Sequence, residues 1–177
     1  MNNRIITLLS LILWLSLCFP LGAQESDETT LSKDETLKVY TFEIREEIAP
    51  PVWRTTQKAF ERAYELGAGL MLIHMNTYGG MVDAADSIRT KILQSRIPVY
   101  VFIDNNAASA GALISIACDS IYMTEGANIG AATVVNQTGE VVPDKYQSYM
   151  RSMMRSTAEA SGRNPDVAEA MVDPSIF

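Results

Sequence analysis

The chain has 177 residues, of which 47% are hydrophobic and 20% charged, and 14 Lys and Arg against 21 Asp and Glu give a formal charge of −7. This composition suits one domain with a sizeable core and excludes a disordered chain. The acidic balance argues against nucleic acid as a partner, because binding phosphates needs clustered Lys and Arg. With one histidine and two cysteines, a thiolate zinc site and a disulfide framework are also excluded.

Residues 1–23 form a predicted signal peptide. Arg4 supplies the positive start, and the apolar run Ile5–Leu21 follows it. Pro20 and the small residues after it favour cleavage between Ala23 and Gln24. An uncleaved membrane anchor is the alternative, because the run is near the minimum length that spans a bilayer. We therefore expect an exported protein.

The rest of the chain is predicted to be an acidic linker at 24–36 and one folded domain at 37–177. Within the domain, predicted strands and helices alternate. Strands are expected at 37–44, 70–75, 97–103 and 120–123, an extended segment at 129–135, and helices at 50–66, 82–94, 107–117, 144–161 and 165–172. The short apolar runs at 70–75 and 97–103 are typical of strands buried on both faces of a parallel sheet. This βαβ series predicts an α/β fold with a mostly parallel sheet and crossover helices.

Two loops follow predicted strands, where parallel sheets place their ligand sites. Asn76–Gly80 ends in two glycines whose backbone N–H groups can point at an oxyanion, although an ordinary tight turn explains a lone glycine pair. In Asn105–Gly111, small neighbours leave the hydroxyl of Ser109 uncovered, and the N–H of Ala110 is a further oxyanion donor. A helix N-cap is the competing interpretation of this serine.

A serine nucleophile needs a base. The only imidazole belongs to His74, in the middle of an apolar predicted strand, where we expect a core or near-core side chain with no route to Ser109. The sequence therefore argues against a Ser-His-Asp triad. Lys145 begins a predicted helix, where the helix dipole favours the neutral amine that can take a serine proton. A solvated lysine in the first helical turn is the simpler alternative.

Four motifs in this order resemble the NfeD family of membrane-bound serine proteases, which belongs to the ClpP/crotonase class. They are Asn76–Gly80, Ala107–Gly111, Ile129–Ala132, and Pro143–Lys145 with the helix that leads to Asn164. The ordered set is far more specific than any one motif. The resemblance extends over residues 39–177 and implies a ClpP/crotonase-like fold.

The resemblance also implies roles for five residues. Ser109 corresponds to the nucleophile and Lys145 to the general base. The N–H groups of Gly80 and Ala110 correspond to the oxyanion hole, and Gly79 shapes the turn. The implied substrates are apolar segments of membrane-associated proteins, with stomatin-like proteins as partners. Assembly into dimers or larger rings is implied, and no metal or organic cofactor is.

The chain departs from the family pattern in two places. Tyr78 stands where the family often has proline, at the rim of the expected cleft, and the chain ends at Phe177. We therefore expect a truncated form that lacks the transmembrane helices and β-barrel of full-length members. The full-length protein is expected at the extracytoplasmic face of a membrane.

Two other functions stay open. A non-catalytic scaffold with the same fold would bind membrane-protein segments and would tolerate the loss of Ser109. A crotonase-type acyl-thioester enzyme shares the fold and the oxyanion hole, but export argues against coenzyme A substrates.

Overall fold

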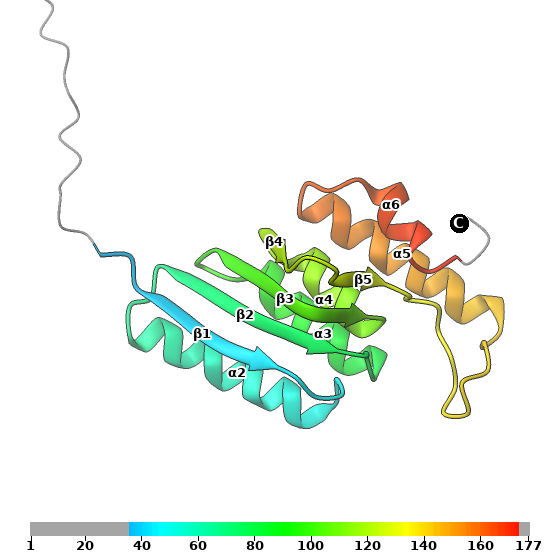
Figure 1. Ribbon diagram of the computed structural model, residues 1–177, viewed down its shortest axis with the longest axis horizontal. Coiled ribbons are helices and arrows are strands. Elements are labelled where there is room, and N and C mark those ends of the chain that lie inside the picture. The colour runs from blue at the N-terminus through cyan, green and yellow to red at the C-terminus, as the bar shows by residue number, and fades with distance from the viewer. Residues whose placement is uncertain (1–35, 174–177) are drawn as a thin grey trace, which may run out of the picture. The chain divides into compact units, whose positions relative to one another are not determined.

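The structure, a computed structural model, describes residues 36–173, and the predicted signal peptide and most of the predicted linker lie outside them. Within this range, five strands form one parallel sheet (Figure 1). They pair in the order β1-β2-β3-β4, and β5 pairs with the end of β3. The strands are β1 (Val39–Ile44), β2 (Leu70–Thr77), β3 (Val99–Ala108), β4 (Ser120–Met123) and β5 (Asn128–Gly130). The predicted α/β fold with a mostly parallel sheet is confirmed.

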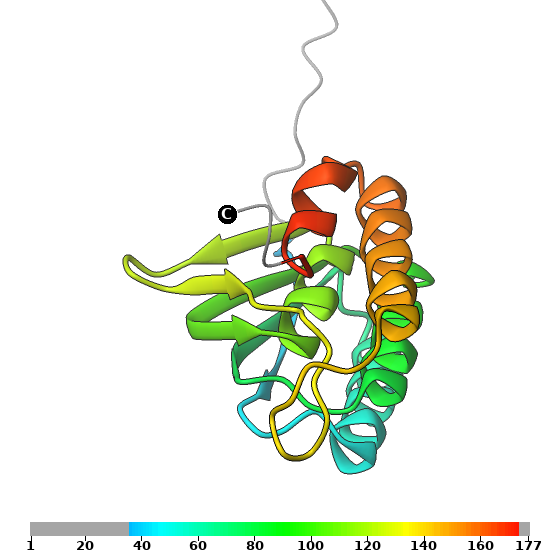
Figure 2. The same ribbon diagram turned by 90° about the vertical axis from the view of Figure 1, so that its right-hand side faces the viewer.

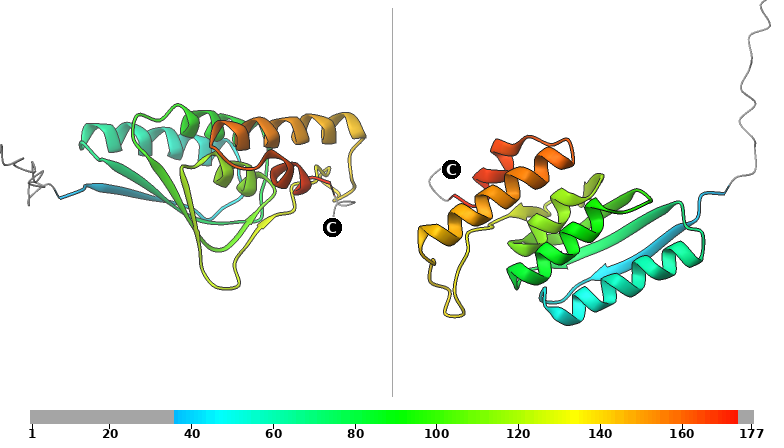
Figure 3. Two further views of the ribbon diagram at one scale, coloured as in Figure 1. Left: turned by 90° about the horizontal axis from the view of Figure 1, so that it is seen from above. Right: turned by 180° about the vertical axis from the view of Figure 1, so that it is seen from behind.

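The described helices lie on one side of this sheet, as the side view in Figure 2 and the top view in Figure 3 show. Pro50 and Pro51 occupy the first turn of one helix, and the side chain of Asn164, which accepts the N–H of Asp166 at 2.8 Å, caps another. None of the helices between residues 36 and 173 is long and apolar enough to span a membrane. The helices are α2 (Pro50–Glu65), α3 (Val82–Leu93), α4 (Ala110–Ala117), α5 (Asp144–Ala160) and α6 (Pro165–Ala170).

The prediction that the central strands are buried on both faces is wrong. Residues of β2 alternate between buried and half-buried, and β3 does the same up to Asp104. The second face of the sheet carries apolar side chains such as Leu72 and Phe102, which made these strands look doubly buried in the sequence. His74 is also on this face, half-buried, with Nδ1 3.9 Å from Asp104 Oδ1, and so it is not a core residue.

Two leucines near the C-terminal ends of helices, Leu66 and Leu93, are exposed. Leu66 is the C-cap of α2 rather than part of its buried face, and it is 45% exposed. Leu93 follows Ile92, which occupies the core position at the end of α3. Successive residues of a helix point about 100° apart, so both cannot face the core.

Helix α4 is the most buried element around the predicted nucleophile. All of its residues are buried, and it begins at Ala110 because β3 continues to Ala108, beyond its predicted end. A Cβ added to Gly111 would lie 2.7 Å from Thr77 Cγ2, so a small residue is needed where α4 meets β2. Cys118 ends α4 fully buried, and this burial raises the pKa of its thiol, which excludes a reactive thiolate there. Ser109 thus lies between a strand and a helix that are both fixed in the core.

Candidate active site

Ser109 occupies a strained turn between β3 and α4. Its φ of 53° and ψ of −116° are uncommon for a residue with a side chain, and such conformations cost about 1–3 kcal/mol. Its N–H donates to the carbonyl of Gly130 at 2.8 Å. Ser109 stands at the N-cap position of α4, but its side chain makes no capping hydrogen bond. The competing N-cap interpretation is therefore correct for the position of Ser109 but not for its side chain.

The Gly79-Gly80 turn packs directly against Ser109. In the sheet, Thr77 of β2 pairs with Ala107 of β3. Gly79 and Ser109, each two residues further along the chain, therefore lie side by side. A Cβ added to Gly79 would lie 2.7 Å from Ser109 Cβ and 3.2 Å from Ser109 Oγ. With a φ of 111° as well, this position accepts only glycine. The structure thus brings two of the predicted motifs into contact.

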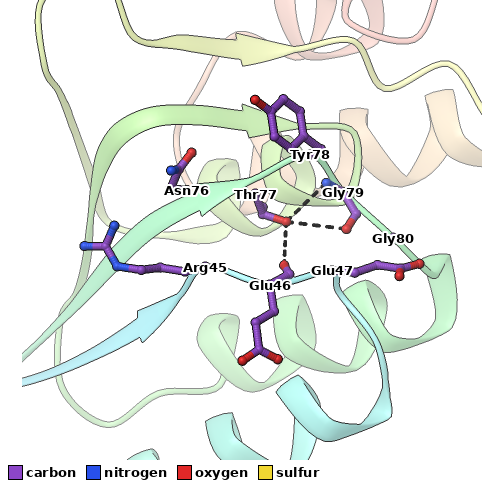
Figure 4. Close-up of a pocket in the computed structure, with 8 residues that line it drawn as sticks. All are labelled: Arg45, Glu46, Glu47, Asn76, Thr77, Tyr78, Gly79 and Gly80. Carbon is purple, nitrogen blue, oxygen red and sulfur yellow. Dashed lines mark hydrogen bonds between the residues drawn. The ribbon is translucent and has the colours of Figure 1, made fainter.

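Two sets of hydrogen bonds hold the glycine turn in place. The hydroxyl of Thr77 donates to the carbonyl of Glu46 at 2.7 Å and accepts the N–H of Gly79 at 3.2 Å (Figure 4). Ile48 N–H donates to the Gly79 carbonyl at 2.8 Å, and the N–H after Gly80 donates to the Ile48 carbonyl at 2.7 Å. This bridge does not use the N–H of Gly80.

Two backbone donors are therefore available beside Ser109. One is the N–H of Gly80, next to the glycine that contacts the serine. The other is the N–H of Ala110, which opens α4 and has no intrahelical acceptor. A pair of fixed backbone donors near a nucleophile can stabilise the oxyanion of an acyl-transfer reaction.

A cavity of about 460 Å³ adjoins the glycine turn. Tyr78 projects from the turn and is 82% exposed, in keeping with the expected rim position. At the same cavity, Arg45 binds Glu43 at 3.0 Å and Asp104 at 2.7 Å, and the hydrogen bond with Glu43 is the main cause that raises the pKa of Arg45. The lining residues, drawn in Figure 4, are Arg45, Glu46, Glu47, Asn76, Thr77, Tyr78, Gly79 and Gly80.

Lys145 lies in the first turn of α5, where the sequence predicts it, and is exposed. It lines a second, mainly apolar groove of about 470 Å³. The predicted nucleophile and the glycine turn are in contact, whereas no hydrogen bond joins Lys145 to Ser109 within residues 36–173. The groove is lined by Val82, Asp83, Asp86, Val134, Lys145, Tyr146, Tyr149 and Met150.

Sequence reasoning missed the polar side chains that support these turns. Besides Thr77, Asn76 Oδ1 accepts the N–H of Asn106 at 3.3 Å, and Asn106 Oδ1 accepts from Asn128 at 2.9 Å. These asparagines lie on three neighbouring strands at the edge that carries the site. The sequence signal that could have indicated them is an asparagine in each of these strands, namely Asn76, Asn106 and Asn128.

Comparison with known protein families identifies the relatives of this chain. The family model described as the NfeD1b N-terminal domain matches residues 38–177. The chain belongs to this family. The membrane protein NfeD1b of Bacillus subtilis is 32% identical over 145 residues, which cover 82% of this chain and 33% of that protein. The membrane-bound protease PH1510 of Pyrococcus horikoshii is 30% identical over 146 residues, which cover 78% of this chain and 33% of that protein. The chain therefore spans about a third of the length of both relatives.

Solved structures of the same kind share the fold. The 1510-N membrane-bound stomatin-specific protease, as a lysine-to-alanine mutant with a substrate peptide, has a TM-score of 0.74 and 29% identity, covering 80% of this chain and 68% of that one. Its serine-to-alanine mutant has a TM-score of 0.73 and 29% identity, covering 78% and 70%. ClpP1 of Listeria monocytogenes, at 24% identity, has a TM-score of 0.56, covering 76% and 79%. The NfeD1b-type domain of this chain therefore has a ClpP-like α/β fold, and it is similar to the N-terminal domain of a membrane-bound protease.

Proposed function

We propose that this protein is an exported serine endopeptidase with a Ser-Lys dyad, in which Ser109 is the nucleophile and Lys145 the general base. The observation that carries the proposal is the packing of the Gly79-Gly80 turn against Ser109 in its strained turn. Strained backbone at a half-buried serine, with backbone donors on both sides, is what an acyl-transfer nucleophile needs and what a purely structural serine does not. The relatives mutated at a serine and at a lysine support the same pair of residue types.

In the proposed reaction, neutral Lys145 takes the proton of the Ser109 hydroxyl while Oγ attacks the scissile carbonyl. The N–H groups of Gly80 and Ala110 bind the resulting oxyanion. Collapse of the tetrahedral intermediate breaks the C–N bond, and the lysine ammonium gives its proton to the leaving amine. Water then attacks the acyl-enzyme while Lys145 accepts a proton from it. The ester C–O bond breaks, the lysine ammonium returns its proton to Ser109 Oγ, and the acid product leaves.

The proposed substrates are peptide bonds in apolar segments of membrane-associated proteins, with a stomatin-like protein as the partner. The relative 1510-N is named as a stomatin-specific protease, and the mainly apolar groove beside Lys145 suits an apolar segment. We place the protein at the extracytoplasmic face of a membrane and expect it to work as a homodimer or larger ring.

The test compares the 177-residue chain with Ser109→Ala and Lys145→Ala on apolar peptides, with products read by mass spectrometry. Ser115→Ala is the matched control for the serine, because its buried hydroxyl on α4 has no partner within residues 36–173. Lys58→Ala, an exposed lysine of α2, is the control for the lysine. Both site variants should lose at least about 100-fold in kcat, while the controls keep the wild-type rate.

The pH dependence tests the lysine separately. Because the base must be deprotonated, kcat should rise with pH and fade in acid, and a flat profile through the acid range would refute the assignment of Lys145. Cleavage that survives both substitutions refutes the mechanism. A folded wild-type chain that binds apolar peptides without cleaving them, equally well after Ser109→Ala, identifies a scaffold instead.

A further inference from the structure

We infer that Gln147 is a positioning residue for Lys145, which holds the first turn of α5 in a fixed relation to the nucleophile. The inference rests on the proposed function above and adds to it a residue that touches neither substrate nor the reacting atoms. It follows from three observations: a buried side-chain amide, the backbone it binds, and the route of that backbone to Ser109.

The amide of Gln147 is fully used by backbone groups. Its side chain, on α5 two residues after Lys145, is 7% exposed. Nε2 donates to the carbonyls of Val134 at 2.7 Å and Val142 at 3.3 Å, and Oε1 accepts the N–H of Val134 at 2.9 Å. Gln147 therefore binds both arms of the loop at 131–143 near its base, much as a neighbouring strand would.

The same loop leads back to the nucleophile. Ser109 N–H donates to the carbonyl of Gly130 at 2.8 Å, and the N–H of Ala132 donates to Met171 at 2.7 Å. Val134, held by Gln147, comes two residues after Ala132. Gly130, Ala132 and Val134 are thus each held by a hydrogen bond through a backbone group. The backbone that connects Ser109 to Gln147 is therefore fixed at alternate residues.

The far end of the loop leads to the proposed base. Residues 131–143 project from the body of the fold and enter α5 directly (yellow to orange in Figure 1 and Figure 3). Val134 and Lys145 line the same groove. Gln147 is therefore a direct side-chain link between the first turn of α5 and the loop that leads to the nucleophile, in addition to the packing of the buried face of α5 in the core.

A helix-packing role alone makes a different prediction. It would lower stability without acting through the lysine, whereas a positioning role lowers the rate of the step that needs the base. A misplacement of about 1 Å in a catalytic group can cost on the order of 100-fold in rate. The two roles therefore separate in kinetics rather than in thermal stability.

The experiment uses the 177-residue chain and the variant Gln147→Met, which keeps the length of the side chain and removes its hydrogen bonds. Peptide cleavage gives kcat and KM, and a fluorophosphonate probe gives the rate of covalent labelling at Ser109, mapped by mass spectrometry. Thr157→Val is the matched control, because it removes a buried hydroxyl of α5 that accepts from Arg89 at 2.9 Å, away from the loop. Gln147→Asn, whose amide is one methylene too short to reach, replaces the methionine variant if that variant does not fold.

We expect Gln147→Met to lower kcat by about 10- to 100-fold with a much smaller change in KM, while Thr157→Val keeps the wild-type kcat. In a Lys145→Ala background, Gln147→Met should no longer change the labelling rate of Ser109, because its effect passes through the lysine. A wild-type kcat in the variant, or an equal loss in both backgrounds, overturns the inference. A wild-type chain that neither cleaves peptides nor labels at Ser109 overturns the proposed function itself, and the inference with it.

Discussion

The two halves of the candidate site are built in different ways. On the nucleophile side, Ser109 and Gly79 are in contact, and both follow strands in the middle of the sheet. On the lysine side, Lys145 is exposed at the start of a helix that is reached through a projecting loop. The first half is fixed by close packing of backbone against backbone, and the second by the buried face of α5 and the side-chain hydrogen bonds of Gln147.

This difference fits the two roles proposed for the two halves, oxyanion stabilisation and proton transfer. In the proposed reaction, oxyanion stabilisation needs donors whose positions do not change, and the strand ends of the sheet hold the N–H groups of Gly80 and Ala110 in place. The proposed proton acceptor is positioned by side chains instead, and its hydrogen bond to the nucleophile can tighten when substrate binds. Substitutions on the nucleophile side should therefore cost stability and activity together, and those on the lysine side mainly activity.

The largest expected effect is at Gly80. A Cβ there would lie 2.3 Å from the carbonyl oxygen of Ile48, at a φ of 149°. Because backbone on both sides would have to shift, Gly80→Ala should cost about 3 kcal/mol or more in the free energy of unfolding and abolish cleavage. Urea denaturation and peptide cleavage measure the two effects.

Gly126→Ala is the matched control for this prediction. Gly126 also has a positive φ, 82°, but an added Cβ would meet nothing within 4 Å. The cost of backbone strain alone should be about 1 kcal/mol, with activity retained. Equal losses in the two variants would show that strain, not the contact with Ile48, decides the effect at Gly80.

A smaller effect is expected at Thr77, which is 1% exposed. Thr77→Val keeps the shape and removes the hydroxyl that joins Glu46 to Gly79, at a cost of about 1–3 kcal/mol in stability with a fall in kcat. Thr77→Ser keeps the hydroxyl and removes the methyl group that packs where α4 meets β2. A threonine-to-serine variant worse than the valine variant would locate the function of Thr77 in its packing instead. Urea denaturation and peptide cleavage again give both readouts.

The same two halves differ in how far sequence alone could predict them. The motifs around Gly79 and Ser109 could be placed at neighbouring strand ends, because parallel βαβ order brings consecutive carboxyl ends together. The strained φ of Ser109 and the supporting hydrogen bonds of Thr77 could not be predicted, because both depend on the exact residue at which β3 ends. That strand continues to Ala108, beyond its predicted end. On the lysine side, the start of α5 was predictable from Pro143 and Asp144, but the distance of its lysine from the serine was not.

The partial exposure of the second face of the sheet could not be predicted from the sequence either. Apolar runs in β2 and β3 predict doubly buried strands, yet alternate residues such as Leu72 and His74 are only half-buried. Whether helices cover one face or two depends on the path of each crossover, which the composition of a strand does not encode.

The smallest expected effect is an acid response confined to the lysine side. In the projecting loop, hydrogen bonds from Asn136 and then Thr138 lower the pKa of Glu140 below its usual value of 4.5. A carboxyl whose pKa is lowered by folding stabilises the fold above its unfolded pKa and loses this contribution as pH falls through the folded value. The loop should therefore loosen only below about pH 4.5, which NMR titration of the Thr138 amide would detect.

Glu140→Gln is the control for this prediction. It should abolish the transition, and the amide of Ala110 should not report it in either protein. An inflection above the usual glutamate range would contradict the assignment.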